Sequence, residues 1–205
     1  MSSVNVQIED MLEDKYGIRM NEQPQCFIGY DSAGNWYNPI RYQNLLQMAV
    51  DIAIISAQNG AGPFGAIVAE STTRIFSYGY NKVISINDST QHAEIVAIRE
   101  AQSLEHSHTL QLGSRSVNLY CSCRPCIQCM GAVWWSGIKD VYYYNVQEQP
   151  QRLGFDEGPQ NETFWEILKE SFKIQKQTHL FAEEDESGYA KIPFEIYEKL
   201  NGRLY

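Results

Sequence analysis

The spacing of apolar residues gives the first indication of structure. In several segments they recur every three or four positions, as on one face of a helix. The longest such segment is 40–58, and the turn residues Asn59-Gly60 follow it, so a helix is predicted to end there. The same pattern predicts helices over 92–104, 126–136 and 163–172. The residues that share a face within 40–58 are Leu45, Leu46, Ala49, Ile52, Ala53 and Ser56.

Between these helices lie short apolar runs bounded by turn residues, which is the pattern of buried strands. The runs 65–70 and 74–81 are predicted to pair as a hairpin. Further strands are predicted at 116–121, 140–145 and 173–177. Because strands and helices alternate, the predicted fold class is α/β, with a central mixed sheet of about five strands and helices on its faces.

The two ends of the chain differ from this alternating region. Residues 1–40 are predicted to form a separate N-terminal extension, with one short helix over 4–11. Residues 41–178 then form the α/β domain. Residues 179–205 have the composition of a polar, acidic C-terminal tail, which ends in Tyr205.

Composition and charge narrow the function classes. The chain has 205 residues, of which 43% are apolar, and its formal net charge of -9 argues against a large nucleic-acid footprint or binding to an anionic membrane. The N-terminus lacks the pattern of a signal peptide, and no apolar run reaches membrane-spanning length. Four of the five cysteines fall within nine residues, unlike an extracellular disulfide scaffold. A soluble cytoplasmic protein is expected.

The cysteine cluster reads C-S-C-R-P-C-I-Q-C over 121–129, which is compatible with a redox cluster, a structural zinc site or a catalytic metal site. Pro125 disfavours helix at the residue before it and suits a helix that begins just after it. Cys126 is therefore predicted at a helix N-terminus, which stabilises thiolates, with Cys129 one turn further on. The other two cysteines are predicted to pack as small hydrophobic residues. A closed four-ligand zinc site that includes Cys123 is the alternative.

Two sulfurs leave the coordination sphere of zinc incomplete, since zinc takes three or four protein ligands. Of the four histidines, His106 and His108 lie in a polar stretch and His179 lies near the tail, whereas His92 opens a predicted helix. His92 and Glu94 belong to H-A-E. Together with the later P-C-I-Q-C, this matches H-x-E…P-C-x-x-C, the signature of zinc-dependent deaminases.

This signature implies a role for each of its residues. His92, Cys126 and Cys129 hold Zn²⁺ and leave a fourth position for water, whose pKa the metal lowers toward about 7. Glu94 is not a ligand. It takes a proton from the water and delivers it first to a ring nitrogen and then to the leaving amine. A CxxC pair alone is often redox-active or structural, so the catalytic interpretation depends on the two motifs together.

The stretch 42–157 resembles the cytidine deaminase superfamily, which implies a three-layer α/β/α cytidine deaminase-like fold. Within it, N-D-S-T-Q-H-A-E (87–94) and G-F-D-E (154–157) are most similar to the small bacterial zinc-dependent guanine deaminases. Arg124 stands where that family usually has Glu, and Ile127-Gln128 stands in place of Pro-Met. These departures leave zinc chemistry intact but leave open whether the substrate is the base or a nucleoside.

The resemblance also implies residues that hold the base. The amide of Asn81 and the backbone N–H of Ala93 are expected to form hydrogen bonds with it, and Phe64 and Trp135 to wall the ring. Glu157, or its neighbour Asp156, is expected to accept hydrogen bonds from guanine N–H groups. The alternatives are core packing for the aromatic residues, a turn for Asn81 and a solvated loop for the two acids.

The family resemblance further implies a homodimer in which the C-terminal segment is exchanged between subunits, with Tyr205 as a lid residue. The expected reaction is hydrolysis of guanine to xanthine and ammonia, in purine catabolism or salvage. Alternatives are a guanosine, aminopurine or triazine deaminase, a tRNA adenosine deaminase, and a non-enzymatic protein stabilised by zinc. The expected substrate is a small purine base rather than nucleic acid.

Overall fold

The computed structural model describes residues 3–16, 18–20, 27–29, 42–70, 74–111, 113, 116–155, 163–167, 170 and 179–204. Its helices are α1 (Ser3–Tyr16), α2 (Tyr42–Gln58), α3 (Val83–Ile86), α4 (Ala93–Leu104), α5 (Ile127–Ser136), α6 (Glu148–Leu153), the 3₁₀ turn η1 (Tyr189–Lys191) and α8 (Ile192–Lys199). The strands are β1 (Ile18–Met20), β2 (Phe27–Gly29), β3 (Gly65–Glu70), β4 (Arg74–Tyr80), β5 (Val117–Cys121), β6 (Asp140–Tyr144) and β7 (His179–Glu183). Residues 163–167 are also helical.

One mixed sheet runs through the molecule in the strand order β1-β2-β4-β3-β5-β6-β7. The neighbours β5-β6 and β6-β7 pair in parallel, and the remaining neighbours are antiparallel. The predicted hairpin of β3 with β4 is confirmed, as are the predicted strands β5 and β6. The predicted strand at 173–177 lies outside the described residues. The strand that closes this edge of the sheet is β7, which lies in the segment expected to be a polar tail.

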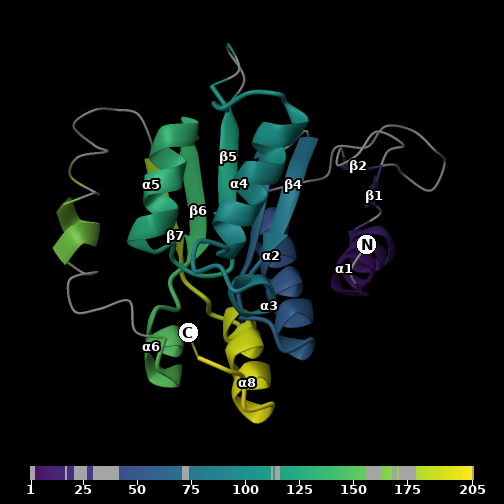
Figure 1. Cartoon of the computed structure of the whole chain (residues 1–205), viewed down its shortest axis with the longest axis vertical. Coiled ribbons are helices and arrows are strands. Elements are labelled where there is room, and N and C mark those ends of the chain that lie inside the picture. The colour runs from purple at the N-terminus through teal and green to yellow at the C-terminus, as the bar shows by residue number, and fades with distance from the viewer. Residues whose placement is uncertain are drawn as a thin grey trace.

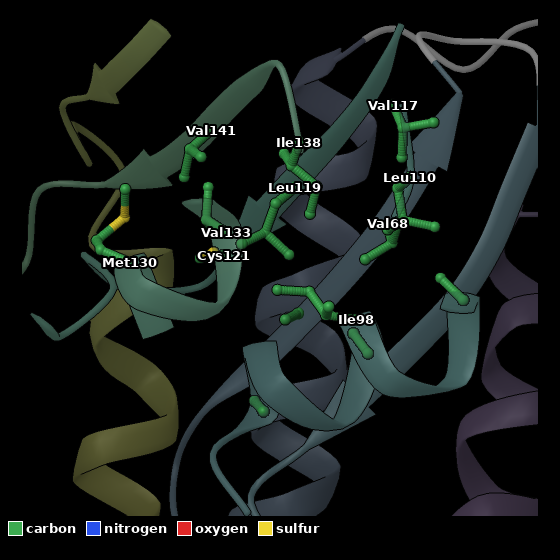
Figure 2. Close-up of a cluster of buried hydrophobic side chains, with 14 of the residues drawn as sticks. Val68, Ile98, Leu110, Val117, Leu119, Cys121, Met130, Val133, Ile138 and Val141 are labelled. Atoms are coloured by element: carbon green, nitrogen blue, oxygen red, sulfur yellow. The ribbon is translucent and has the colours of Figure 1, made fainter. Parts of the chain in front are cut away.

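Helices cover both faces of the central strands, which confirms the predicted α/β fold (Figure 1). Alternation along β3 divides its side chains between the two faces. Ala66 and Val68 pack in the cluster beneath α4 and α5, whereas Ile67 and Ala69 pack in the cluster beneath α2. Figure 2 shows the first cluster, to which β5 and β6 contribute Val117, Leu119, Cys121 and Val141.

The N-terminal extension and the C-terminal segment both pack onto the α/β domain. Helix α1 buries Ile8 and Leu12 in the cluster beneath α2. At the other end, α8 packs against α2 and buries Phe194 and Tyr197, although the sequence predicted a tail too polar to pack alone. None of the described helices has the length and hydropathy needed to span a bilayer.

Candidate metal centre

His92 is presented by a tight turn at the start of α4. The Asp88 carboxylate accepts hydrogen bonds from the backbone N–H and hydroxyl of Thr90 and from the side-chain amide of Gln91, at 2.7–2.9 Å. These bonds lower the pKa of Asp88 to about 2. His92 follows as the N-cap residue, with φ −66° and ψ 153°, and its carbonyl accepts the first helical hydrogen bond, from Val96. The N-D-S-T-Q motif therefore builds the turn that positions His92.

The two cysteine ligands come from the start of α5, as predicted from Pro125. Cys126 is the N-cap residue, with an extended backbone at φ −75° and ψ 173°, and its carbonyl accepts a hydrogen bond from Met130. Cys129 lies one turn further on and is completely buried. Gly137 ends the helix in the left-handed conformation that favours glycine, at φ 74°.

The three predicted ligands converge. His92 Nδ1 lies 3.5 Å from Cys126 Sγ and 3.6 Å from Cys129 Sγ, and the two sulfurs lie 3.6 Å apart. With Zn–S bonds of about 2.3 Å and Zn–N bonds of about 2.1 Å, tetrahedral geometry separates two sulfurs by about 3.8 Å and a sulfur from a nitrogen by about 3.6 Å. The donor set fits Zn²⁺ in both chemistry and size, with three protein ligands as in a catalytic site.

The electrostatics of the site prepare one thiolate for the metal. Contact with Cys129, and then with His92, lowers the pKa of Cys126 to about 4 against the opposing effect of burial. Burial raises the pKa of the Cys129 thiol. The N-terminal position on α5 also favours a thiolate at Cys126.

Glu94 lies in the first turn of α4, two residues after the histidine ligand, and its side chain is almost completely buried. Burial raises the pKa of its carboxyl group, and the nearby Cys126 thiolate raises it further. The carboxyl group is also within hydrogen-bond reach of Cys129. A carboxyl group this close to the candidate metal ligands has the chemistry to accept and return a proton.

The remaining two cysteines of the cluster are packed as predicted. Cys121 ends β5 and is buried in the cluster beneath α5 (Figure 2). Cys123 is buried beside Val50 and Phe194, and its thiol donates to Gln147 Oε1 at 3.7 Å. Among the described residues, the candidate metal group comprises His92, Cys126 and Cys129 and does not include Cys123.

Arg124, which departs from the family pattern, stacks on the ring of Trp165, 5.2 Å from the ring centroid. Trp165 belongs to the helical residues 163–167 and packs edge-on against Tyr143 of β6. Arg124 as a whole is half-buried. Its placement connects the loop before the metal helix to a later segment of the chain.

Asn81 directly follows β4 and is buried. Its side-chain oxygen accepts a hydrogen bond from the backbone N–H of Val83 at 3.1 Å, and its own backbone N–H donates to the carbonyl of Phe64 at 3.3 Å. The first contact is the turn role that the sequence left open. It also fixes the orientation of the amide, because the oxygen is engaged and the NH₂ group is then the donor presented elsewhere.

Phe64 is half-buried. It packs against two clusters of buried side chains: the cluster beneath α4 and α5, and the cluster that contains Cys123 and Phe194. Its ring packs edge-on against Phe155, with centroids 5.2 Å apart, and against Phe194, with centroids 5.5 Å apart. The sequence did not identify these two supporting rings. Phe155 stands inside G-F-D-E. Phe194 lies in I-P-F-E-I-Y, where a proline followed by apolar residues at helical spacing could have predicted a buried helix.

Of the remaining predicted base-binding residues, the structure describes Ala93 and Trp135. Ala93 is the first residue of α4, so its N–H has no partner within the helix and points toward the helix N-terminus. The side chain of Trp135 is 82% exposed on α5, whereas Cys129 and Val133 of the same helix are buried. Asp156, Glu157 and Tyr205 lie outside the described residues. The preceding Leu204 lies beside Gly154, so the described parts of these two segments meet.

A test of the metal geometry arises at Gly79 of β4, on which α4 packs. A Cβ at this position collides with the carbonyl oxygen of Ala93 and lies 2.7 Å from the backbone nitrogen of Ala97. Gly79→Ala is therefore expected to displace the start of α4, to weaken zinc binding, and to lower the free energy of unfolding by about 1–3 kcal/mol. Urea unfolding and competition with a chelator measure the two effects.

Gly65→Ala is the matched control, because a Cβ there collides with backbone atoms of Ala49 and Ala53 in α2, which carries no ligand. It should lower stability similarly and leave zinc affinity unchanged. Equal zinc affinities of the two variants would show that the fit of α4 on β4 does not position His92.

Known proteins resemble this chain over the same region. Residues 39–145 match the model of the cytidine and deoxycytidylate deaminase zinc-binding region. The guanine deaminase of Bacillus subtilis is 34% identical over 120 residues, which cover 58% of this chain and 74% of that protein. A tRNA-specific adenosine deaminase of Buchnera aphidicola is 38% identical over 98 residues, which cover 48% of this chain and 62% of that protein.

Two solved structures have the same fold. A structure of the guanine deaminase from Nitrosomonas europaea aligns with a TM-score of 0.67 at 21% identity, over 99% of this chain and 94% of that one. The structure of the guanine deaminase from Bacillus subtilis aligns with a TM-score of 0.53 at 32% identity, over 62% of this chain and 75% of that one.

Proposed function

We propose that this chain, which belongs to the zinc-dependent cytidine and deoxycytidylate deaminase family, hydrolyses guanine to xanthine and ammonia. Zinc-dependent nucleobase deamination is the chemistry of its family and relatives, and guanine is the specific proposal. The observation that carries the proposal is the grouping of His92, Cys126 and Cys129 as candidate metal ligands. The buried Glu94 lies in the first turn of α4, whose N-cap residue is His92. The similarity to a guanine deaminase over 74% of that protein's length supports the choice of base.

In the proposed mechanism, the chain's own residues position the base and carry the protons. His92, Cys126 and Cys129 would hold the zinc ion, which when bound would supply a nucleophile at neutral pH by lowering the pKa of water to about 7. Glu94 accepts one proton from the attacking water and transfers it to N3 of guanine, so that C2 can be attacked. It then accepts the remaining proton of that water from the hydroxyl group added at C2 and passes it to the amino group, which leaves as ammonia. Its raised pKa suits a group that must hold a proton between these steps.

Recognition of the base follows from the groups around the site. The NH₂ group of Asn81 is oriented to donate to guanine O6, because the amide oxygen is already engaged by Val83. The ring of Phe64 supplies an aromatic face, and the N–H of Ala93 supplies a second donor. We further propose that Glu157 or Asp156 accepts from the N1–H and amino group of the base, and that Tyr205 covers it within a homodimer.

A tRNA adenosine deaminase is the second candidate, favoured by the 38% identity to such an enzyme over 98 residues. A binding site for tRNA needs cationic groups that engage phosphates. The formal net charge of -9 opposes it, as does the acidic run 183–186, which begins at the end of β7. The free base is therefore the favoured substrate.

The test is a steady-state assay of the purified zinc-loaded protein with guanine, guanosine and a tRNA anticodon stem-loop. Guanine is expected to release ammonia and xanthine with kcat of about 1–10³ s⁻¹, and a chelator is expected to abolish the reaction. Absence of ammonia release from guanine, with one zinc ion bound per chain, would refute the proposal. Inosine formation in the stem-loop at higher kcat/KM would establish the second candidate instead.

A further inference from the structure

A buried carboxylate lies at the meeting point of the two ends of the chain. Asp51 of α2 is 6% exposed and accepts hydrogen bonds from Lys15 Nζ at 2.9 and 2.8 Å. It also accepts a hydrogen bond from the hydroxyl of Tyr16, and one from the hydroxyl of Tyr189 at 2.5 Å. One side chain of the α/β domain therefore binds both the N-terminal helix α1 and the C-terminal turn η1.

The cation of Lys15 strengthens this link. Lys15 Nζ also donates to the Tyr189 hydroxyl at 3.2 Å and lies 5.4 Å from the ring centroids of both Tyr16 and Tyr189. Burial lowers the pKa of Lys15, but its hydrogen bonds to Asp51 and Tyr189 outweigh burial and raise it overall. The lysine stays charged and holds the two tyrosines on the same carboxylate.

From Tyr189 the contacts lead to the predicted base-binding ring. The backbone N–H groups of Tyr189 and Ala190 donate to the Asp185 carboxylate, which holds η1 in shape. Helix α8 continues directly from η1 and places the completely buried Phe194 edge-on against Phe64.

We propose that Asp51 is a positioning residue for the substrate pocket: it ties α1 and η1 together and thereby holds Phe194 behind Phe64. This assigns a task to the N-terminal extension, which fastens the C-terminal segment in place. Packing alone would not need a carboxylate at this position, because removing a charge from water is costly unless several donors compensate it. Here donors from both ends of the chain supply that compensation, and the inference about substrate binding rests on the proposed guanine deaminase function.

Hydrogen exchange on the full zinc-loaded chain tests the link without relying on activity. Asp51→Asn keeps the shape of the side chain but removes the charge that Lys15 and the tyrosines share. Amide exchange in 189–199 is expected to become about tenfold faster, because hydrogen bonds to a buried charge are lost. Tyr189→Phe deletes a single donor to Asp51 and should accelerate exchange in the same residues by a smaller factor. This milder variant still tests the link if Asp51→Asn does not fold.

Ile8→Val is the matched control, since it removes one methyl group from the buried face of α1 and leaves all four side chains of the hydrogen-bonded network unchanged. It should leave exchange in 189–199 at the wild-type rate. Wild-type exchange in Asp51→Asn would overturn the proposal.

The kinetic arm asks whether the link serves substrate binding. Asp51→Asn is expected to raise KM for guanine about tenfold, with kcat within about threefold of wild type and zinc content unchanged, because Phe64 loses its backing while Glu94 and the ligands stay in place. Faster exchange with an unchanged KM would overturn the positioning role. If the wild-type protein does not deaminate guanine, the proposed function fails, and the exchange arm still decides whether Asp51 ties the two segments.

Discussion

Glu94→Gln is expected to leave zinc bound and to lower kcat for deamination by a factor of about 10²–10⁴, the contribution of a positioned general acid and base. Glutamine is nearly isosteric with glutamate, and Glu94 is not among the three candidate metal ligands. The amide cannot accept a proton and return it to the leaving amino group. Zinc content by elemental analysis and ammonia release by a coupled assay measure the two quantities.

The same substitution separates the enzyme from a zinc-stabilised interaction protein. Glu94 is buried and its pKa is raised mainly by burial, so a neutral amide should fit the site at little cost in stability. Undiminished turnover in Glu94→Gln would remove the proposed proton carrier from the mechanism.

The helices that carry the ligands were predictable because local signals agreed. Pro125 before Cys126 and the turn before His92 mark two helix starts, and each start places a ligand at its N-cap. The long helix α2 was equally clear from its apolar spacing and its Asn59-Gly60 end. Where capping, turn chemistry and periodicity indicate the same boundary, the sequence suffices to locate a side chain.

The parts that sequence could not place depend on contacts between distant segments. β1 and β2 have three residues each, too few to show alternation. The side chains of β7 are exposed or half-buried at the sheet edge, so this strand lacks the alternation of buried and exposed residues by which strands are predicted. Asp51 gave no signal either, since its partners lie 35, 36 and 138 residues away in the chain.

The surroundings of Trp135 and Arg124 could not be predicted from the motif that contains them. Trp135 is expected to wall the base, and its side chain is 82% exposed on α5, the helix that buries Cys129 and Val133. Arg124 has no obvious role in the sequence because its partner, Trp165, lies 41 residues later. A motif specifies chemistry at its ligands, whereas neighbouring positions are set by the packing of each particular chain.

Cys126→Ser is expected to abolish stable zinc binding, and with it activity, because the alcohol is a far poorer ligand than a thiolate whose pKa is lowered to about 4. The free energy of unfolding should then become independent of zinc concentration, since a ligand stabilises a fold only through the site that binds it. Titration of zinc against a chromophoric chelator, together with thermal unfolding at several zinc concentrations, measures both effects.

Cys123→Ser provides the contrast within the same nine residues. Cys123 lies among apolar side chains, so the hydroxyl should lower the free energy of unfolding by about 1–3 kcal/mol while zinc still binds and still stabilises the fold. Cys126→Ser and Cys123→Ser make the same chemical change, so comparing them separates the effect of losing the metal from the effect of weaker packing. Loss of zinc from Cys123→Ser as well would instead favour a closed four-ligand site, and an enzyme with no open position for water could not carry out the proposed reaction.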